Sequence, residues 1–433
     1  MHRMVCLKRV DWTRLVQKQG LVYTVDTDPS DPFHHYWREG SYYSFDLEEI
    51  EALEKAAKVV FEMCIEAGDY MAEHPELMIR MGIPEWAHAM VLHEWNRDPE
   101  FGSVYGRFDF RFGGFNYPAP EMRVPKLYEF NADTPTGLVE STAIQWAWLE
   151  NLAVGEDQWN HAYEMLVLAW KRNMELIVRD RGLSSPTVHF AIGDGQGSFE
   201  DEMNCLQIAS ACKDAGYGIK TIFMENIKLG DDGRFYDEED QHIDVIFKLY
   251  PWEHMVHQEF GRAAFEDMER PNGTYWIESP YKMLWSNKAL LAVLWMLFKD
   301  DAEKAQYLLP AYFEEDAPDM PVGYARKPLL SREGANISLV APDGTELVEV
   351  IDKEYGEEGF ILQELAQPPI FTSDEYGIVH PVLGIWMIDG EPAGMLIRES
   401  ASPVTDDFAN FVPHIITSKD GQRAYTHKPV PLY

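Results

Sequence analysis

Alternating polar and aromatic residues mark two segments in the first third of the chain. In "YGRFDFRF", which begins at residue 105, charged residues alternate with phenylalanine, and "KLYEFNAD", which begins at residue 126, alternates in the same way. Successive side chains of a β-strand point to opposite faces. The pattern therefore predicts two strands, each with an aromatic face and a polar face. The polar faces carry Arg107, Asp109, Arg111, Glu129, Asn131 and Asp133.

These polar faces allow two interpretations. A half-buried antiparallel sheet normally exposes its polar face to water, so the charges would be ordinary surface residues. Alternatively, the faces hold a metal, because Mg²⁺ prefers hard oxygen ligands and usually takes one or two carboxylates together with phosphate oxygens. Asp109, Glu129 and Asn131 supply such groups. Arginines beside them can neutralise charge on a transferring phosphoryl group.

Hydrophobic residues at helical spacing predict a series of helices elsewhere in the chain. The clearest covers residues 46–75, where Asp46 and Glu49 are expected to form a capping box. Further helices are expected at about 137–153, 156–180 and 284–298.

From residue 187 the pattern changes to short apolar runs. The strand "TVHFAI", the glycine-rich turn "GDGQGS", a helix over residues 199–215 and the strands "IKTIFM" and "IDVIFKLY" predict a small β-α-β unit of the doubly wound kind. The turn lacks the GxGxxG spacing of a dinucleotide site. The last third is rich in strands, including a hairpin that turns at Asp389-Gly390.

Composition narrows the class of protein. The chain has 433 residues, 46% of them hydrophobic, which indicates a globular protein of two or three packed units. A net charge of −36 argues against nucleic acid and anionic membranes as partners and suits a cationic substrate. There is no signal peptide and no apolar run long enough to span a bilayer, so we expect a soluble, cytoplasmic protein. The four cysteines form no CxxC pair and predict neither a disulfide framework nor a zinc site.

Further phosphate-binding chemistry follows in the last third. Lys327 lies on a predicted strand, and Gly334 lies in the next loop, whose N–H groups can fold over phosphates. The backbone of residues 363–365, in "ILQEL", can pair with an adenine edge between apolar walls. Arg398 brings a guanidinium to the closing hairpin. Each feature is common alone, but together and in this order they indicate a nucleotide site.

The segments "YGRFDFRF", "KLYEFNADTPT", "YKMLWSNKALL", "GYARKPLLSREGANI", "ILQEL" and "GEPAGMLIRES" resemble the synthetase domain of glutathionylspermidine synthases, above all their shorter, single-domain relatives. The resemblance spans nearly the whole chain. It implies an α/β (α+β) ATP-grasp fold with a pre-ATP-grasp β-α-β domain, in a permuted order that puts the metal-binding strands before the nucleotide lid. The expected domains are 1–185, with the N-terminal helices and metal-binding strands, 186–280, the β-α-β domain, and 281–433, the nucleotide-binding lid and tail.

The resemblance also implies a reaction. A carboxylate attacks the γ-phosphate of ATP, and an amine then attacks the acyl phosphate to form an amide. The expected partners are ATP, Mg²⁺, a small or short-peptide carboxylic acid and a cationic amine. By match to the family, Asp109, Glu129 and Asn131 would bind Mg²⁺, and Arg107 would lie beside the transferred phosphate. The ATP-binding residues would be Lys288, Lys327, Gln363, Glu364, Leu365 and Arg398.

This sequence departs from the family at two points. Bifunctional members carry an N-terminal cysteine amidase domain, whereas this chain begins directly in the synthetase part. Serines that contact glutathione in the family are replaced by Thr134 and Thr136, which puts glutathione itself in doubt.

Two alternatives stay open at the level of the sequence. One is a non-catalytic relative that keeps the fold and binds nucleotide. The other is a carbohydrate-active enzyme, since 13 tryptophans and many carboxylates suit sugar binding. A metalloprotease is disfavoured, because His254 and His257 are spaced i, i+3 instead of i, i+4.

Overall fold

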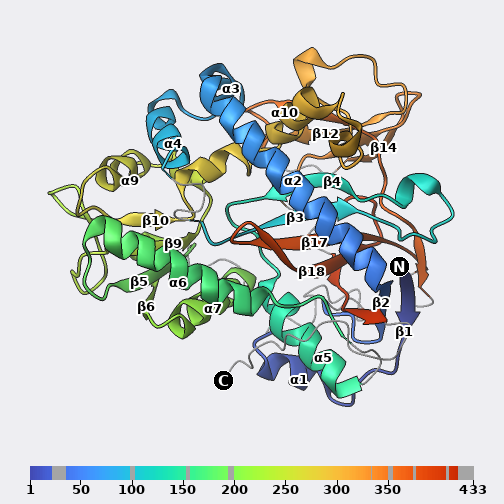
Figure 1. The fold of residues 1–433 in the computed structure, drawn as a ribbon, viewed down its shortest axis with the longest axis horizontal. Coiled ribbons are helices and arrows are strands. Elements are labelled where there is room, and N and C mark those ends of the chain that lie inside the picture. The colour runs from blue at the N-terminus through green and yellow to red at the C-terminus, as the bar shows by residue number, and fades with distance from the viewer. Residues whose placement is uncertain are drawn as a thin grey trace.

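The computed structural model is a mixed α/β protein with several sheets (Figure 1). The structure describes residues 1–21, 36–97, 103–152, 157–193, 199–332, 334–349, 355–373, 377–405 and 409–417.

A six-stranded sheet at the centre of the molecule contains both alternating segments. They form strands β3 (Tyr105–Arg111) and β4 (Lys126–Asn131), which pair antiparallel as predicted. On its other edge β3 pairs with β17 (Gly377–Ile388), and β17 forms the predicted hairpin with β18 (Glu391–Ser400). The sheet therefore joins strands from the first and last thirds of the chain. Its remaining strands are β16 (Phe371–Ser373) and β19 (Asn410–Phe411).

The polar face of β3 is buried. The exposed fractions of Arg107, Asp109 and Arg111 are 5%, 2% and 5%. The interpretation of this face as an ordinary wet surface is therefore wrong. The charges are kept out of water by other parts of the chain, and buried charges require partners.

Helix α2 (Leu47–Glu73) crosses the aromatic side of this sheet (Figure 1). Its capping box forms as predicted, with Asp46 at the N-cap and Glu49 at N3. The aromatic faces of the strands continue into this packing, since the Phe130 ring lies 5.7 Å from that of Trp285, which in turn contacts Phe61 of α2. One face of the sheet is thus core, and the other is free to build a site.

Three predicted helices begin later than expected. Residues 140–144 form a π-helical turn, η3 (Glu140–Ile144), before α5 (Gln145–Leu152). The helix expected from residue 156 is α6 (Ala162–Arg181), because residues before it make β-bridges, as in Asn160 with Gly394. The helix expected from residue 284 is α10 (Ala289–Phe298), which follows the 3₁₀ helix η5 (Pro280–Leu284).

The predicted β-α-β unit is confirmed as a parallel four-stranded sheet of order β10-β9-β5-β6. The turn "GDGQGS" lies almost entirely outside the described residues. The elements of this unit are β5 (Thr187–Ile192), α7 (Phe199–Asp214), β6 (Gly218–Phe223), β9 (Val245–Leu249) and β10 (Tyr275–Ile277).

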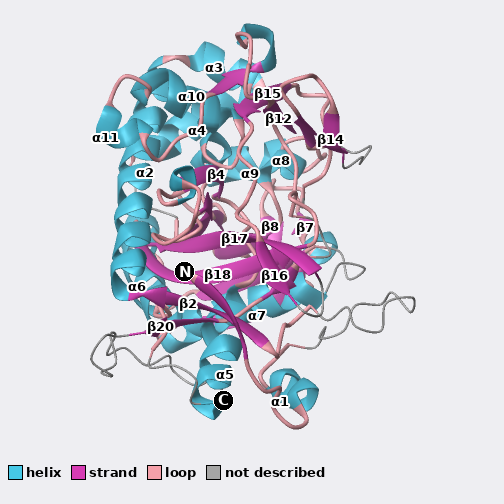
Figure 2. Cartoon of the chain, turned by 90° about the vertical axis from the view of Figure 1, so that its right-hand side faces the viewer, coloured by secondary structure: helices cyan, strands magenta, loops and turns pink. Residues whose placement is uncertain are grey.

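A five-stranded antiparallel sheet carries the predicted lid residues and lies with α10 at the upper end of the molecule, above β17 and β18 (Figure 2). Its strands are β11 (Ala311–Phe313), β12 (Tyr324–Pro328), β13 (Ser338–Val340), β14 (Glu346–Glu349) and β15 (Phe360–Glu364).

The remaining elements surround these sheets. The strands are β1 (His2–Val5), β2 (Ser41–Asp46), β7 (Lys228–Leu229), β8 (Phe235–Tyr236) and β20 (His414–Thr417). The helices are α1 (Trp12–Lys18), α3 (Pro75–Arg80), α4 (His88–Trp95), α8 (Trp252–Met255), α9 (Gly261–Met268) and α11 (Ala302–Ala305).

The three predicted domain segments stay a prediction, although the central sheet combines strands of the first and the third segment. Within the described ranges, no helix is both long and apolar enough to cross a membrane. The cytoplasmic location also stays a prediction.

Candidate nucleotide and metal site

The register of β3 and β4 brings the predicted metal ligands together. Asp109 lies opposite Glu129, and Arg107 lies opposite Asn131. The amide nitrogen of Asn131 is 3.3 Å from Oδ2 of Asp109 and 3.1 Å from Oε1 of Glu129. The three side chains therefore converge on one point of the polar face.

Two guanidinium groups hold Asp109. Arg107 donates from Nε to Oδ1 at 2.8 Å and from Nη2 to Oδ2 at 3.1 Å, and Arg398 of β18 donates to Oδ2 at 2.7 Å. Burial alone would lower the pKa of Arg107, but the contact with Asp109 outweighs burial and raises it. Arg107 thus stays charged beside the predicted metal ligands.

Two lysines face Glu129 from different elements. The Lys288 ammonium is 3.3 Å from Oε2 of Glu129 and donates to the carbonyl of Ser331 at 2.6 Å. Lys327 of β12 donates to the carbonyl of Tyr128 at 3.1 Å. Burial would raise the pKa of Glu129, but Lys288, Lys327 and Arg398 together lower it to about 2. Burial lowers the pKa of Lys327 to about 8, although Glu129 opposes this shift.

A cleft opens beside these groups, between the central sheet and the five-stranded sheet. Asp109, Glu129, Lys327 and Arg398 line its charged end, and the residues Gln363, Glu364 and Leu365 line its other part. These predicted site residues thus come to one cleft from the first and last thirds of the chain, whereas Arg107, Asn131 and Lys288 are not among its lining residues. Its apolar walls include Ala325, Ile337, Leu339, Val382 and Val404.

Hydrogen bonding within the five-stranded sheet limits which backbone groups of residues 363–365 are free to contact adenine. The N–H groups of Glu364 and Leu365 already donate to the carbonyls of Pro310 and Gly323. Neither N–H can therefore pair with a base. Ala366 and Gln367, which also line the cleft just beyond the strand, are the next backbone groups that a base would meet.

A second cavity also has Glu129 in its lining. Glu129, Asn131 and Lys288 line it together with Glu253 and Arg332, which the sequence did not single out. Arg332 donates to the carbonyl and hydroxyl oxygens of Thr134 at 3.0 and 2.8 Å. In the sequence, Arg332 could have been noticed only because it belongs to the segment "SREGAN", which carries the family resemblance. Glu253 directly precedes His254, and no sequence pattern pointed to it.

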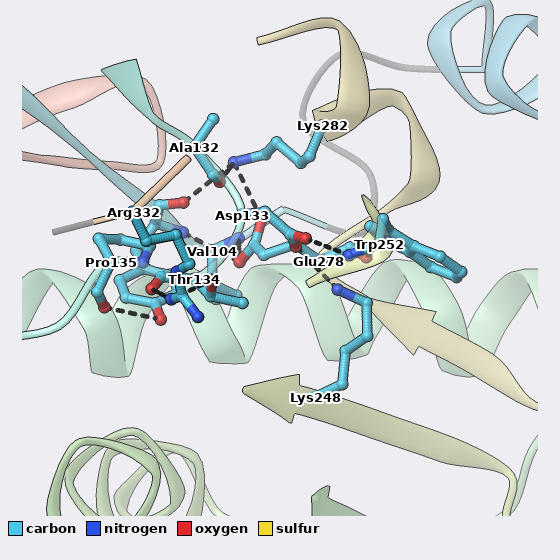
Figure 3. A network of polar contacts seen from close by, with 11 residues as sticks. Val104, Ala132, Asp133, Thr134, Pro135, Lys248, Trp252, Glu278, Lys282 and Arg332 are labelled. Carbon is cyan, nitrogen blue, oxygen red and sulfur yellow. Dashed lines mark hydrogen bonds and ion pairs between the residues drawn. The ribbon is translucent and has the colours of Figure 1, made fainter. Parts of the chain in front are cut away.

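A buried network behind the second cavity connects the end of β4 to the β-α-β unit (Figure 3). Asp133 accepts from the Lys248 ammonium and from the backbone N–H of Trp252, both at 2.8 Å. The Trp252 indole donates to the carbonyl of Glu278, and Glu278 pairs with Lys282 at 3.1 Å. Because Asp133 lies two positions after Asn131, the last residue of β4, this network fixes the end of β4 relative to Lys248 of β9 and to Trp252, which follows β9.

The side chains present fit Mg²⁺ and a polyphosphate. Two carboxylates and an amide supply hard oxygens, which Mg²⁺ accepts alongside phosphate oxygens and water. Among the described residues no group of three or more His, Cys, Asp or Glu side chains gathers as a metal cage. The proposed ligand set therefore depends on Asn131 and on oxygens that a bound nucleotide brings.

Comparison with known proteins identifies relatives along the whole chain. The family model "Glutathionylspermidine synthase preATP-grasp" matches residues 3–417. A Haemophilus influenzae protein named "Putative acid--amine ligase" is 31% identical over 401 residues, covering 89% of this chain and 92% of the relative. The bifunctional glutathionylspermidine synthetase/amidase of Escherichia coli is 26% identical, and the match covers 90% of this chain and 60% of that protein.

Two further comparisons concern relatives at greater distance. Trypanothione synthetase of Crithidia fasciculata is 26% identical over 78% of this chain and 52% of its own length. A glutathione synthetase-like effector from Globodera pallida has a similar fold, with a TM-score of 0.53, 11% identity and coverage of 94% of this chain and 96% of that one. The relatives are named as ligases and synthetases, which confirms the predicted ligase class. The chain belongs to the glutathionylspermidine synthase pre-ATP-grasp family.

Proposed function

We propose that this protein is an ATP- and Mg²⁺-dependent acid–amine ligase that forms an amide through an acyl phosphate. The observation that carries the proposal is the place of Glu129, which lines both the apolar-walled cleft and the second cavity. A nucleotide in the cleft would present its terminal phosphate next to an acid in the second cavity. Family membership and the names of the relatives support this reaction class.

The cations around Glu129 suit the first step. The acid's carboxylate oxygen attacks the γ-phosphorus, the bond to the β-phosphate oxygen breaks, and ADP leaves. Lys288, Lys327 and Arg398 face this position and would stabilise the charge on the phosphoryl group as it moves. A Mg²⁺ ion held by Asp109, Glu129 and Asn131 would supply further charge neutralisation and orientation of the phosphates.

The second step needs positioning more than a nucleophilic side chain. The amine attacks the acyl carbon, the C–N bond forms and phosphate leaves. Holding amine and acyl phosphate in one cavity makes this attack effectively intramolecular, which accounts for much of the rate enhancement in reactions of this kind.

The substrates follow from charge and from the relatives. A net charge of −36 favours a cationic amine such as a polyamine or a basic amino acid. The acid is expected to be an amino acid or short peptide. Thr134, which stands where the family resemblance implies a serine, lies in the second cavity and accepts a hydrogen bond from Arg332, so the acid need not be glutathione.

The test is an ADP-release screen. Amino acids and short peptides, including glutathione, are crossed with polyamines, including spermidine, and amino acids in the presence of Mg-ATP. The proposal expects ADP release that requires both an acid and an amine, with an amide product of the summed mass less water. Binding of Mg-ATP without turnover on any pair would favour the non-catalytic alternative instead. The relatives described above are named as ligases and synthetases, which gives the carbohydrate-active alternative no support.

A further inference from the structure

The second step of the proposed reaction raises a proton problem. A primary alkyl amine with a pKa near that of lysine, about 10.4, is uncharged in only about one molecule in a thousand at pH 7.4. The ammonium form has no lone pair with which to attack. An enzyme for this step needs a base close to the bound amine, and general bases typically contribute about 10²- to 10⁴-fold.

Among the described residues, three carboxylates line the second cavity, and two of them form ion pairs with lysines. Glu129 pairs with Lys288 at 3.3 Å, and Asp133 pairs with Lys248 at 2.8 Å. Glu129 also has Lys327 and Arg398 nearby and is one of the proposed Mg²⁺ ligands, so its carboxylate is already engaged. The third carboxylate is Glu253.

Glu253 differs from the other two in its surroundings. It is partly buried, and in the described part of the chain no hydrogen bond or ion pair joins its carboxylate to another residue. Burial raises its pKa; Asp133 and Glu358 act in the same direction, and Arg332 and Lys288 oppose them. A carboxylate with a raised pKa is a stronger base than an ordinary one.

The backbone that carries Glu253 is fixed. Glu253 belongs to the short helix α8, directly after Trp252, whose N–H donates to Asp133 and whose indole donates to Glu278 (Figure 3). Asp133 in turn follows the strand that bears Glu129 and Asn131. The buried network thus fixes the position of Glu253 relative to Glu129 and Asn131, which line the same cavity.

We propose that Glu253 is a catalytic residue that binds the ammonium group of the amine substrate and takes up its proton. This inference rests on the proposed ligase function. The ammonium gives one proton to the Glu253 carboxylate, and the freed lone pair forms the C–N bond with the acyl carbon. The bond from that carbon to the phosphate oxygen breaks, and the departing phosphate takes the second proton of the nitrogen. Glu253 returns its proton to water when product leaves.

Hydroxylamine tests this assignment, because it is uncharged at neutral pH and attacks an acyl phosphate without a base. The wild type, Glu253→Gln and Glu259→Gln are each given Mg-ATP and the best acid from the screen, with either the best cationic amine or hydroxylamine. Glu259 is an exposed carboxylate six positions further on, so its variant controls for the loss of one charge. Melting curves establish that each variant is folded.

We expect Glu253→Gln to lower kcat for amide formation about 100-fold or more at pH 7.5 and to leave hydroxamate formation within about threefold of the wild type. The amide defect should shrink as the pH approaches the pKa of the amine, and Glu259→Gln should match the wild type. Equal loss of both products, or no loss of either, would overturn the role of Glu253 alone. If the wild type makes neither product with any acid, the ligase proposal itself fails.

Discussion

The cleft and the second cavity share Glu129 but are built differently. The cleft lies between two sheets, and its charged residues stand on strands β3, β4, β12, β15 and β18. The second cavity is lined by the end of β4 and by short helices and loops: the start of α8, the turn before α10 with the start of that helix, and the loop with Arg332. Strands hold side chains at spacings set by hydrogen bonding, whereas loops tolerate change.

The cleft and the second cavity suit different parts of the proposed reaction. A rigid site with paired charges suits chemistry that does not depend on the substrate, which we propose is phosphoryl transfer. Loop residues such as Thr134 suit the choice of substrate, since Thr134 borders the second cavity outside the charge pairs of Glu129. Changes at the paired charges around Glu129, including Lys288 in the second cavity, should therefore affect every substrate pair, whereas changes at Thr134 should affect the acid selectively.

The largest effect is expected where the two sites meet. Glu129→Ala removes the carboxylate that both share and leaves Lys288 without its ion-pair partner. ADP formation with every substrate pair should fall by about 10³-fold or more, by analogy with the loss of groups that stabilise transition-state charge. A coupled ADP assay measures this, with Glu121→Ala, an exposed carboxylate, as the control. Near-normal turnover in a folded Glu129→Ala protein would remove Glu129 from the site.

An effect confined to the cleft is expected from Lys327→Met. Losing a charge-assisted hydrogen bond costs about 1.5–3 kcal/mol, so the Kd for Mg-ATP should rise about 10- to 150-fold, with little change in the KM of the acid or the amine. Isothermal titration measures it. Arg326→Met is the matched control, since Arg326 neighbours Lys327 but pairs with the exposed Glu314.

The same lysine predicts a pH dependence of nucleotide binding. Burial lowers the pKa of Lys327 to about 8, so the free protein loses this positive charge as the pH rises through 8. The affinity for Mg-ATP should be flat below pH 8 and fall above it, by at most about tenfold per pH unit for one proton. In Lys327→Met this fall should be absent. A decline of the same size in the variant would assign it to another group.

A smaller, selective effect is expected in the second cavity. Thr134→Val removes the hydroxyl that accepts from Arg332, a hydrogen bond worth about 0.5–1.5 kcal/mol or slightly more because the donor is charged. The KM of the acid should rise about fivefold while the Kd of Mg-ATP stays the same. Thr134→Ser keeps the hydroxyl and serves as the control. An equal loss of nucleotide affinity would contradict the separation of the two sites.

The smallest effect concerns the net charge of the whole protein. If the acidic surface attracts the amine, its KM should rise about two- to threefold between 0.05 and 0.3 M salt, because the Debye length is only about 10 Å at 0.1 M. The KM of Mg-ATP, an anion, should stay flat or fall. An amine KM that ignores salt would mean that the charge serves solubility only.

Local patterns in the sequence account for much of the fold. The alternation in β3 and β4, the capping box of α2 and the hairpin at Asp389-Gly390 each depend on residues a few positions apart. At Asp389 and Gly390 both φ angles are positive, at 55° and 77°, as such a tight turn requires. Features of this range can be predicted from one segment alone. The starts of α6 and α10 cannot, because distant strands or preceding 3₁₀ turns set them.

The amino-acid sequence alone thus gave the polar faces of the two strands and the family resemblance, and it predicted Asp109, Glu129 and Asn131 as metal ligands. Only the tertiary structure decided that the polar face of β3 is buried, that the N–H groups of Glu364 and Leu365 are already used, and that Glu253 faces the same cavity as Glu129. The physical reason is the separation along the chain between the residues that set each feature. Periodicity is set by neighbouring peptide units, whereas burial and charge pairing depend on which distant segments come to lie against a face. Here β18 brings Arg398 to Asp109, and the five-stranded sheet brings Lys327 to Tyr128.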